Sequence, residues 1–498
     1  MSTNVSRRDF VKAAGTVAGV TLAAGFSPFS CAQNEKLRVA MIGVGAQNKF
    51  HIESGIAQTP EIEIVALVDC LFANQARGWF AAGEKPELKK HCYYDYRVML
   101  EKEKDNVDAV VIATPYKTHY QIVMDCLDAG KYVFCEKTMA HTHEACRDIV
   151  TKCHDTGKFV QCGHQRRYNP DYLHAVKQIK DGRMGRITFV EAQWHRNGDW
   201  RNPPPKKDDG SDIVLNAEEV KLIKDLNRLV NWRIYEEYSA GLLSELATHH
   251  VECVNWIMGK APSRVYTTGG TDYWRDDRDT CDNLALIYEY DVSPGDHGFA
   301  TISKRSDYQQ LTKINRPYTV RFTWSGLLTS FRKGESILLL GDTGAIELSE
   351  RTEVKKDQKT PLYHPEPTLI WLDPKTMKPT TDEKIINWIK TTGQSRKYTR
   401  LQDHPSIPFD AELDPDAFDI SPDARQFQAF VHHIRNGGKP RTNEMCGMIA
   451  SVCDIAIRRC GSSISRRPIH SNSEYSSQIV STGGAEGKRI GEKAWCKE

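Results

Sequence analysis

A buried strand runs into a glycine-rich turn at Leu37-Arg38-Val39-Ala40-Met41-Ile42-Gly43-Val44-Gly45-Ala46-Gln47-Asn48. Gly43 permits the tight turn, and Gly45 lets the backbone approach a pyrophosphate at the amino end of the next helix. Asn48 stands where the dinucleotide fingerprint has its third glycine. The stretch therefore predicts a phosphate-binding turn that opens a helix over residues 48–58.

The next strand, residues 63–68, ends at Asp69. A carboxylate there accepts hydrogen bonds from the ribose hydroxyls and repels a 2′-phosphate, which favours NAD over NADP. Strands at 107–113 and 131–135 and a helix-strand pair at 143–161 follow. This alternation predicts an α/β fold with a doubly wound parallel sheet. The same kind of domain with another ligand is the alternative.

After residue 161 the pattern changes to longer strands that alternate apolar and polar residues, as in a sheet with one covered face. These strands are expected at residues 186–194, 264–269, 282–290, 298–303, 319–324 and 336–340. Residues 350–417 are rich in Lys, Pro, Asp and Thr, which predicts a surface insertion. Residues 423–436 and 444–460 read as helices that close the fold.

The first residues differ from the rest of the chain. Ser6-Arg7-Arg8-Asp9-Phe10-Val11-Lys12 precedes a short apolar run over residues 13–24, a pattern typical of a signal peptide. The arginine pair resembles the twin-arginine export signal, which implies export of a folded protein to the periplasm. The run would span only roughly 18 Å as a helix, too short to cross a membrane. An amphipathic helix or a chance arginine pair is the alternative, and Cys31 is a candidate lipid-anchor site.

The composition describes an ordinary globular chain of 498 residues with a net charge of +2 and 40% hydrophobic residues. These values exclude a disordered chain and give no basic footprint for nucleic acid. The 14 cysteines show no C-x-x-C spacing. Because a protein folded in the reducing cytoplasm can keep thiols in its core, we expect mostly buried, free cysteines.

Five motifs in order resemble the Gfo/Idh/MocA family, named after glucose-fructose oxidoreductase, inositol dehydrogenase and a rhizopine catabolism protein. They are Gly43-Val44-Gly45, Asp69, the segment from Ala113-Thr114-Pro115 to His119, Glu136-Lys137, and Gly241-Leu242-Leu243-Ser244-Glu245-Leu246-Ala247-Thr248-His249. Thr138 replaces the family's proline, Glu245 its aspartate and Ala247 its glycine. The resemblance runs from about Leu37 to Ile469.

The arginine motif implies a signal peptide at 1–36. The family resemblance implies an NAD-binding Rossmann domain at 37–163 and a substrate-binding α/β domain at 164–469, which leaves a tail at 470–498. It implies an open, mostly antiparallel second sheet whose exposed face pairs subunits in a homodimer or homotetramer. It also implies cofactor contacts at Gly43, Val44, Gly45, Ala46, Gln47, Asn48, Asp69, Thr114, Pro115, His119, Glu136, Lys137 and Gln165.

For catalysis the resemblance implies that Lys137 faces the nicotinamide and that His249 lies near the substrate. We expect His249 to remove a hydroxyl proton, Lys137 to stabilise the alkoxide, and Glu245, one helical turn earlier, to orient the imidazole. An exposed loop lysine and a satisfied core histidine are the alternatives. Aromatic planes and polar donors suited to a carbohydrate predict substrate contacts at Arg166, Tyr168, Trp194, His195, Arg196, Trp200, Arg233 and His250. Helix capping at Thr142 explains the nearby histidines, and we predict no metal.

The leading hypothesis is an exported oxidoreductase that acts on a ring hydroxyl of a sugar or glycoside, at C3, with tightly bound NAD. A redox-neutral, NAD-dependent glycoside hydrolase would use the same motifs. A non-catalytic sugar-binding protein is the hypothesis from a different class.

Overall fold

The computed structural model describes residues 35–180, 184–203, 214–294, 296, 317–330, 333–341, 344–348, 368–371, 406–408, 420–461 and 469–470. The predicted export signal up to residue 34, with Cys31, lies outside these residues. The expected strand at 298–303 and nearly all of the tail also lie outside them. The expected insertion at 350–417 is described only at 368–371 and 406–408.

The glycine-rich turn follows the first strand of a parallel sheet. Among the described residues the strand order is β3-β2-β1-β4-β5-β6. The strands are β1 (Leu37–Ile42), β2 (Ile62–Val68), β3 (Cys92–Tyr93), β4 (Ala109–Ile112), β5 (Tyr132–Cys135) and β6 (Val160–Cys162). The order reverses between β1 and β4, and ligands of such sheets bind at the carboxyl ends of the strands at this point. The predicted doubly wound sheet is confirmed.

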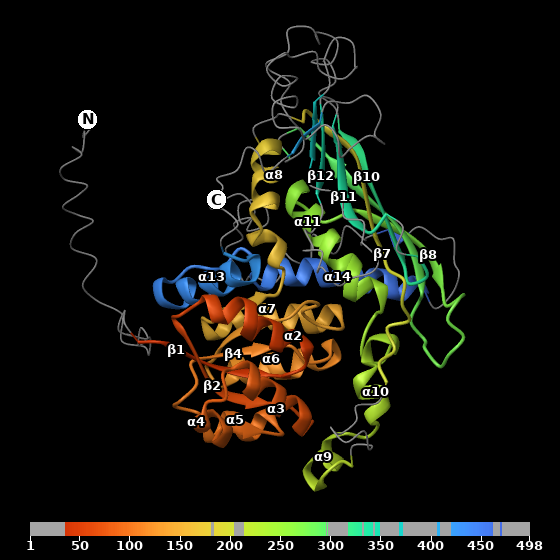
Figure 1. Cartoon of the computed structure of the whole chain (residues 1–498). Helices are drawn as coiled ribbons and strands as arrows, with labels where there is room; N and C mark the ends of the chain where they lie inside the picture. Colours follow the sequence, from red (N-terminus) through yellow and green to blue (C-terminus); the bar gives the residue numbers. More distant parts are fainter. Residues whose placement is uncertain are drawn as a thin grey trace, which may run out of the picture. The chain divides into compact units, whose positions relative to one another are not determined.

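Helices cover both faces of this sheet (Figure 1). They are α2 (Ala46–Phe50), the π-helix η1 (His51–Gly55), η2 (Ile56–Gln58), α3 (Phe72–Ala81), α4 (Pro86–Lys90), α5 (Tyr96–Lys102), η3 (Tyr116–Thr118), α6 (His119–Asp128) and α7 (His143–Thr156). Thr142 caps α7 as expected, because its side chain accepts the N–H of Ala145. After β6 the chain forms η4 (Gln165–Tyr168) and α8 (Pro170–Lys180).

The second sheet has the order β14-β13-β12-β11-β7-β10-β9-β8-β15. Its described strands are β7 (Ile187–His195), β8 (Arg264–Gly270), β9 (Asn283–Val292), β10 (Tyr318–Leu327), β11 (Glu335–Gly341), β12 (Gly344–Leu348), β13 (Thr368–Trp371), β14 (Ser406–Pro408) and β15 (Ile469–His470). β7 and β10 pair in parallel, and the other neighbours are antiparallel. The sheet is therefore mixed and mostly antiparallel, as the resemblance implied.

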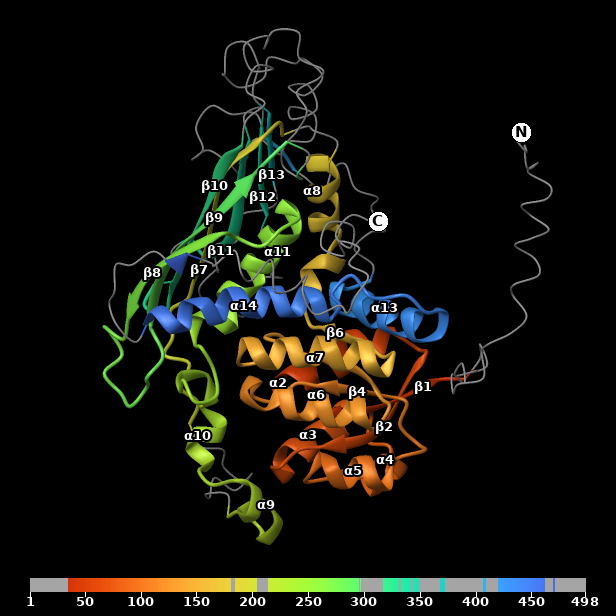
Figure 2. The same ribbon diagram turned by 180° about the vertical axis from the view of Figure 1, so that it is seen from behind.

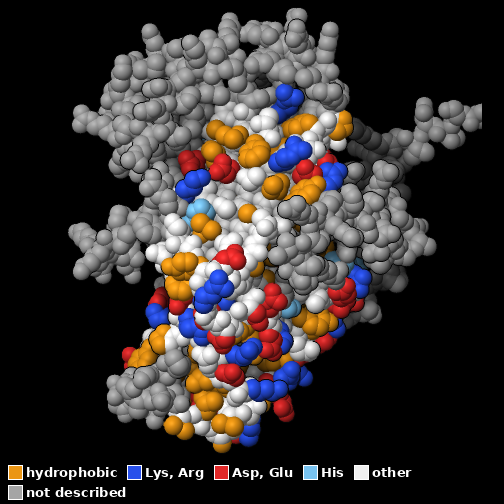
Figure 3. Space-filling model, turned by 90° about the vertical axis from the view of Figure 1, so that its right-hand side faces the viewer, with side chains coloured by type: hydrophobic (Ala, Val, Ile, Leu, Met, Phe, Trp, Pro, Cys, Tyr) orange, Lys and Arg blue, Asp and Glu red, His pale blue; other side chains and the backbone are white. Residues whose placement is uncertain are grey.

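One face of the second sheet is buried and the other is half open, which explains the alternating sequence. Tyr288, Phe322 and Trp324 are buried in the inner core together with residues of η6 (Leu243–Ala247) and α11 (Thr248–Met258). On the outer face Tyr266 and Ile287 remain 37% and 41% exposed. Figure 3 shows hydrophobic side chains mixed with charged ones on this side of the molecule.

Two C-terminal helices complete the core of the first sheet. They are α13 (Pro422–Asn436) and α14 (Glu444–Gly461), which Figures 1 and 2 show end to end between the two sheets. Phe427 of α13 stacks on Phe134 of β5, with ring centroids 4.8 Å apart. Met448 of α14 belongs to the cluster on the opposite face of the sheet. Chain segments far from β1–β6 in sequence therefore bury the first sheet.

The cysteines in the described part of the chain are free thiols. Those that are buried are Cys126, Cys135, Cys146, Cys153, Cys162, Cys253 and Cys453. The expectation of mostly buried, free cysteines is confirmed for this part of the chain. No described helix is both long and apolar enough to span a bilayer.

We predict that Phe427→Ala lowers the free energy of unfolding by about 3–5 kcal/mol, because it leaves a cavity against Phe134. Urea denaturation followed by fluorescence measures this loss. Phe80→Ala is the matched control, since Phe80 is 59% exposed and its loss should change stability little. Equal stability losses in the two variants would contradict the packing role of α13.

Candidate active site

The glycine-rich turn has the geometry of a dinucleotide cradle. Gly43 has φ +78°, and a Cβ there would lie 2.7 Å from Thr114 Cγ2. A Cβ on Gly45 would meet nothing within 4 Å, so the backbone is open to a ligand at this point. Asp69 holds the turn, because its Oδ2 accepts the N–H of Val44 at 2.8 Å. These residues fit the pyrophosphate and ribose of a dinucleotide.

Two residues expected to bind the cofactor instead hold the loops around it. Asn48 is buried, and its Nδ2 lies 2.9 Å from the carbonyl oxygen of Gly43 and 3.3 Å from that of Val111. His119 is also buried, with its ring nitrogens 2.8 and 2.9 Å from the carbonyl oxygens of Thr138 and Thr114. Both side chains turn inward to satisfy backbone groups, which corrects their assignment as direct ligands.

Glu136 and Lys137 follow β5 at the same edge of the sheet. Glu136 Oε2 accepts the backbone N–H of Lys137 at 3.0 Å, and its Oε1 accepts from Gln47 at 3.2 Å. A Cβ on Gly163 would lie 2.8 Å from the Glu136 carboxyl carbon, so only glycine fits after β6. The peptide bond from Lys137 to Thr138 is cis. Glu136 is therefore fixed from three strand ends.

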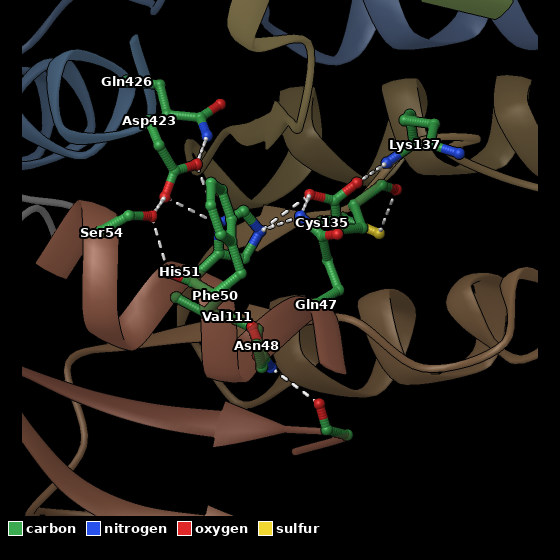
Figure 4. A network of polar contacts seen from close by, with 12 residues as sticks. Gln47, Asn48, Phe50, His51, Ser54, Val111, Cys135, Lys137, Asp423 and Gln426 are labelled. Atoms are coloured by element: carbon green, nitrogen blue, oxygen red, sulfur yellow. Dashed lines mark hydrogen bonds and ion pairs between the residues drawn. The ribbon is translucent and has the colours of Figure 1, made fainter. Parts of the chain in front are cut away.

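His51 anchors Glu136 from below (Figure 4). Its Nε2 lies 2.8 Å from Glu136 Oε1, and its Nδ1 lies 2.9 Å from Asp423 Oδ1 of α13. Burial would lower the pKa of His51, but the charges and hydrogen bonds of Asp423 and Glu136 outweigh it and raise the pKa to about 10. Burial would raise the pKa of Glu136, but the His51 imidazolium lowers it. His51 is therefore protonated and Glu136 ionised at neutral pH.

Lys137 reaches across to the second half of the chain. Its Nζ donates to the carbonyl oxygens of Ser244 at 3.0 Å and Glu245 at 3.2 Å, and lies 3.6 Å from Glu245 Oε2. Arg233 Nε donates to the same Oε2 at 3.1 Å. Burial would raise the pKa of Glu245, but the charges of Lys137 and Arg233 lower it. Lys137, Glu245 and Arg233 thus form one charged group.

Glu245 does not orient His249, which corrects the expectation of an α-helical pair. Residues Leu243–Ala247 form a π-helical turn, and α11 begins only at Thr248. The wider turn places the Glu245 carboxylate against Lys137 and Arg233. The described residues give His249 no hydrogen-bond partner. Its ring lies beside Trp194, with centroids 5.8 Å apart.

His249 is held in its neutral form. Burial first, and then the positive charges of Arg166 and Lys137, lower the pKa of His249 well below its ordinary value. A neutral imidazole can accept a proton, so His249 has the chemistry of a general base. Lys137 and Arg166 are therefore close enough for their charges to act on the His249 imidazole.

Aromatic and basic side chains surround Trp194. The guanidinium carbons of Arg166 and Arg196 lie 5.0 and 5.3 Å from its ring centroid. Trp200, at φ +61°, packs against the core of the second sheet. Gln165 is half-buried in η4, directly after β6 and Gly163. The structure brings Trp194, Arg166, Arg196 and His249 together.

Two expected substrate contacts, His195 and Tyr168, are placed elsewhere, and a third, His250, stacks on Trp194 with ring centroids 5.5 Å apart but is enclosed by other side chains. His195 lies on the opposite face of β7 from Trp194, because strand residues alternate, and its Nε2 is 2.9 Å from Ser325 Oγ. His250 is fully buried between Trp324 Nε1, at 3.0 Å, and Glu335. Tyr168 is buried, with its hydroxyl 3.4 Å from Thr442 Oγ1. These positions correct the assignments of His195, His250 and Tyr168 as substrate contacts.

His164 is a candidate that the sequence analysis missed. It is 2% exposed, and its ring nitrogens have no hydrogen-bond partner among the described residues. Burial lowers the pKa of His164, and the charges of Glu136 and Lys137 also act on it. A buried imidazole without partners carries a desolvation penalty that a ligand could relieve. The sequence could have identified His164 as a site candidate from its position directly after β6, at the carboxyl edge of the sheet.

We predict that His51→Gln weakens the fold most at low pH. A raised pKa means that the imidazolium contributes fully below about 6.5, progressively less as pH rises toward about 10, and nothing above that. Breaking such a buried pair costs about 3–5 kcal/mol. The urea midpoints of wild type and His51→Gln, measured between pH 6 and 10.5, should therefore approach each other as the pH rises.

His154→Gln is the control for that series, because His154 is exposed and its pairing with Asp155 is on the surface. A gap between wild type and His51→Gln that stayed constant with pH would show that His51 is neutral in the fold.

The sequence matches two family models. Residues 37–164 match "Oxidoreductase family, NAD-binding Rossmann fold", and residues 176–399 match "Oxidoreductase family, C-terminal alpha/beta domain". Among curated relatives, the chain is 26% identical over 217 residues to an inositol 2-dehydrogenase/D-chiro-inositol 3-dehydrogenase of Lactiplantibacillus plantarum. That match covers 43% of this chain and 57% of the relative.

Two further comparisons bear on the chemistry and the fold. An alpha-N-acetylgalactosaminidase of Shewanella oneidensis is 26% identical over 233 residues, covering 40% of this chain and 50% of that protein. The chain thus spans about half the length of these curated relatives. The WlbA dehydrogenase of Bordetella pertussis, solved with NADH and UDP-GlcNAcA, superposes with a TM-score of 0.56 at 18% identity. The superposition covers 86% of this chain and 96% of that chain, and shows the shared fold.

Proposed function

The chain belongs to the Gfo/Idh/MocA oxidoreductase family, and from this premise we propose that it transfers hydride between NAD and the carbon that bears a ring hydroxyl of a sugar or glycoside. One observation carries the proposal. Lys137, at the carboxyl edge of the nucleotide-binding sheet, is hydrogen-bonded to the π-helical turn that leads into His249. The charged group of Lys137, Glu245 and Arg233 therefore connects the nucleotide-binding sheet to the turn that precedes His249.

His249 is proposed as the base that removes the hydroxyl proton. Its lowered pKa keeps the imidazole neutral but also weakens it as a proton acceptor, so the proposal rests on its position beside Trp194 and after the turn that Lys137 contacts. Lys137 would stabilise the negative charge that develops on the oxygen. When bound, NAD supplies the hydride acceptor. Glu245 acts as a positioning residue, because its carboxylate holds both Lys137 and Arg233.

The substrate class rests on the residues around His249. The Trp194 ring offers an apolar surface to C–H groups, and Arg196 lies over that ring. Arg166 also lies over it but is only 1% exposed and is paired with Glu335, so it positions the ring. Flat aromatic surfaces beside hydrogen-bond donors suit a carbohydrate. The relative named as an inositol dehydrogenase supports a polyol-like substrate. We propose oxidation at C3, the position that a dehydrogenase and an oxidation-elimination hydrolase would share.

A redox-neutral glycoside hydrolase is the second candidate, favoured by the similarity to the protein named alpha-N-acetylgalactosaminidase. In such a reaction, oxidation at C3 acidifies the C2 proton. The aglycone is then eliminated, water adds, and the ketone is reduced again. Incubation with p-nitrophenyl glycosides separates the two. Nitrophenol released without net NADH supports hydrolysis, and a ketosugar formed with an acceptor supports the dehydrogenase.

Export is part of the proposal. The segment Ser6-Arg7-Arg8-Asp9-Phe10-Val11-Lys12 supports the proposal that residues 1–36 are a twin-arginine signal peptide, which directs export of the protein to the periplasm. Cys31 is the candidate site for a lipid anchor. Because free NAD should be scarce there, we propose a tightly bound cofactor. We also propose domains at 37–163 and 164–469, and a homodimer or homotetramer formed through the outer face of the second sheet.

We predict that the purified protein carries NAD(H). Denaturing extraction followed by chromatography should identify the nucleotide and its redox state. Protein that contains no nucleotide and does not bind added NADH would contradict the proposed function as a whole.

We predict that Lys137→Met and His249→Asn each lower turnover of a true substrate by about 10²–10⁴-fold, because each removes a group that acts on the transferred proton or charge. NADH binding, measured by fluorescence, should persist in His249→Asn. Lys49→Met and His154→Asn are matched controls on exposed positions. Full turnover in Lys137→Met would overturn its catalytic role.

A further inference from the structure

A helical arm reaches from the second half of the chain to the nucleotide-binding sheet. We define the arm as residues 214–234, which include α9 (Ala217–Leu222), α10 (Leu226–Val230) and η5 (Trp232–Ile234). Figures 1 and 2 both show α9 at the tip of the arm, beside α3. Val220 and Leu222 remain exposed on the tip, whereas Ile223, directly after α9, is buried.

Polar contacts hold the tip in place. Glu219 Oε1 accepts the backbone N–H of Phe72 at 2.7 Å, and Asn216 Nδ2 donates to the Tyr94 hydroxyl at 3.0 Å. Glu219 Oε2 accepts the N–H of Asn216, which completes a capping box at the start of α9. Glu219 is only 3% exposed although it lies at the tip. Its carboxylate is therefore fixed in position.

Glu219 lies beside the carboxylate that is expected to read the ribose. Asp69 Oδ1 accepts the N–H of Leu71 at 2.9 Å, and Glu219 accepts that of the next residue, Phe72. Burial and the charge of Asp69, with a smaller contribution from Glu219, raise the pKa of Cys70 to about 12. The carboxylates of Asp69 and Glu219, from different parts of the chain, thus accept hydrogen bonds from successive backbone N–H groups after β2.

The base of the arm contacts the other end of the site. Arg233 donates to Glu245, which lies 3.6 Å from Lys137 Nζ. The arm therefore touches residues associated with both ends of a bound dinucleotide, the ribose end at Asp69 and the reacting end at Lys137. A dinucleotide lies along the carboxyl edge of such a sheet.

We propose that Glu219 is a second residue that selects NAD against NADP, supplied by the substrate-binding half of the chain, and that its charge opposes the cation of Arg77, which acts on Asp69 from α3. The inference rests on the proposed NAD binding and deepens it. A 2′-phosphate after β2 would meet the charge of Glu219 as well as that of Asp69. It would also find the Phe72 N–H already occupied, although a backbone N–H at the start of a helix is the donor that a phosphate uses.

The test compares affinities for NADH and NADPH in the full chain after removal of any co-purified nucleotide. Fluorescence titration should show that Glu219→Gln binds NADPH at least about tenfold more tightly than wild type, which corresponds to about 1.4 kcal/mol. NADH affinity should change by less than about threefold, because no charge opposes the 2′-hydroxyl. Glu218→Gln is the matched control, since Glu218 is the exposed neighbour paired with Lys221.

Asn216→Ala gives an independent variant should Glu219→Gln fold poorly. It removes the bond to Tyr94 and the side chain that caps α9, so it should shift the NADPH-to-NADH ratio in the same direction by a smaller factor. Unchanged ratios in the variants, with NADH binding intact, would overturn the role of Glu219 alone. A wild-type protein that bound neither nucleotide would overturn the proposed function together with this inference.

Discussion

The charge of the buried His51 imidazole is the constraint on which the site geometry depends. Its two ring nitrogens pair with Glu136 and Asp423, two buried acidic side chains from different parts of the chain. Glu136 in turn accepts the backbone N–H of Lys137, and Lys137 donates to the π-helical turn before His249. A continuous series of polar contacts thus connects α13 to the turn that precedes the candidate base. Each contact fixes the next, so the reacting groups sit on a rigid framework.

Local patterns predicted the framework well. The run into Gly43 and Gly45 and the strands ending at Asp69 and Lys137 are continuous apolar segments, which identify buried strands in any context. The alternation in β9 and β10 likewise predicted a sheet with one covered face. Because successive residues of a strand face opposite sides of the sheet, the sequence alone could have placed His195 on the opposite face from Trp194.

Other features depend on contacts that the sequence does not display. His51 meets Asp423 across hundreds of residues, and no local period indicates such a pair. The π-helical turn at Leu243–Ala247 shifts Glu245 away from His249, although the spacing of the two residues is that of an α-helical pair. Asn48 and His119 have the polarity of ligands but satisfy buried carbonyl groups. In each case the tertiary contacts determine which of two possible roles the residue has.

The helices that bury the parallel sheet have a consequence for how the protein is made. The strands β1–β6 are synthesised early, while α13 and α14, which cover Phe134 and the opposite core cluster, are synthesised after strands β7–β14 of the second sheet. The nascent nucleotide-binding portion therefore keeps apolar surface uncovered until α13 and α14 have been synthesised. Completion of its core depends on this later segment, which makes α13 and α14 a checkpoint for assembly.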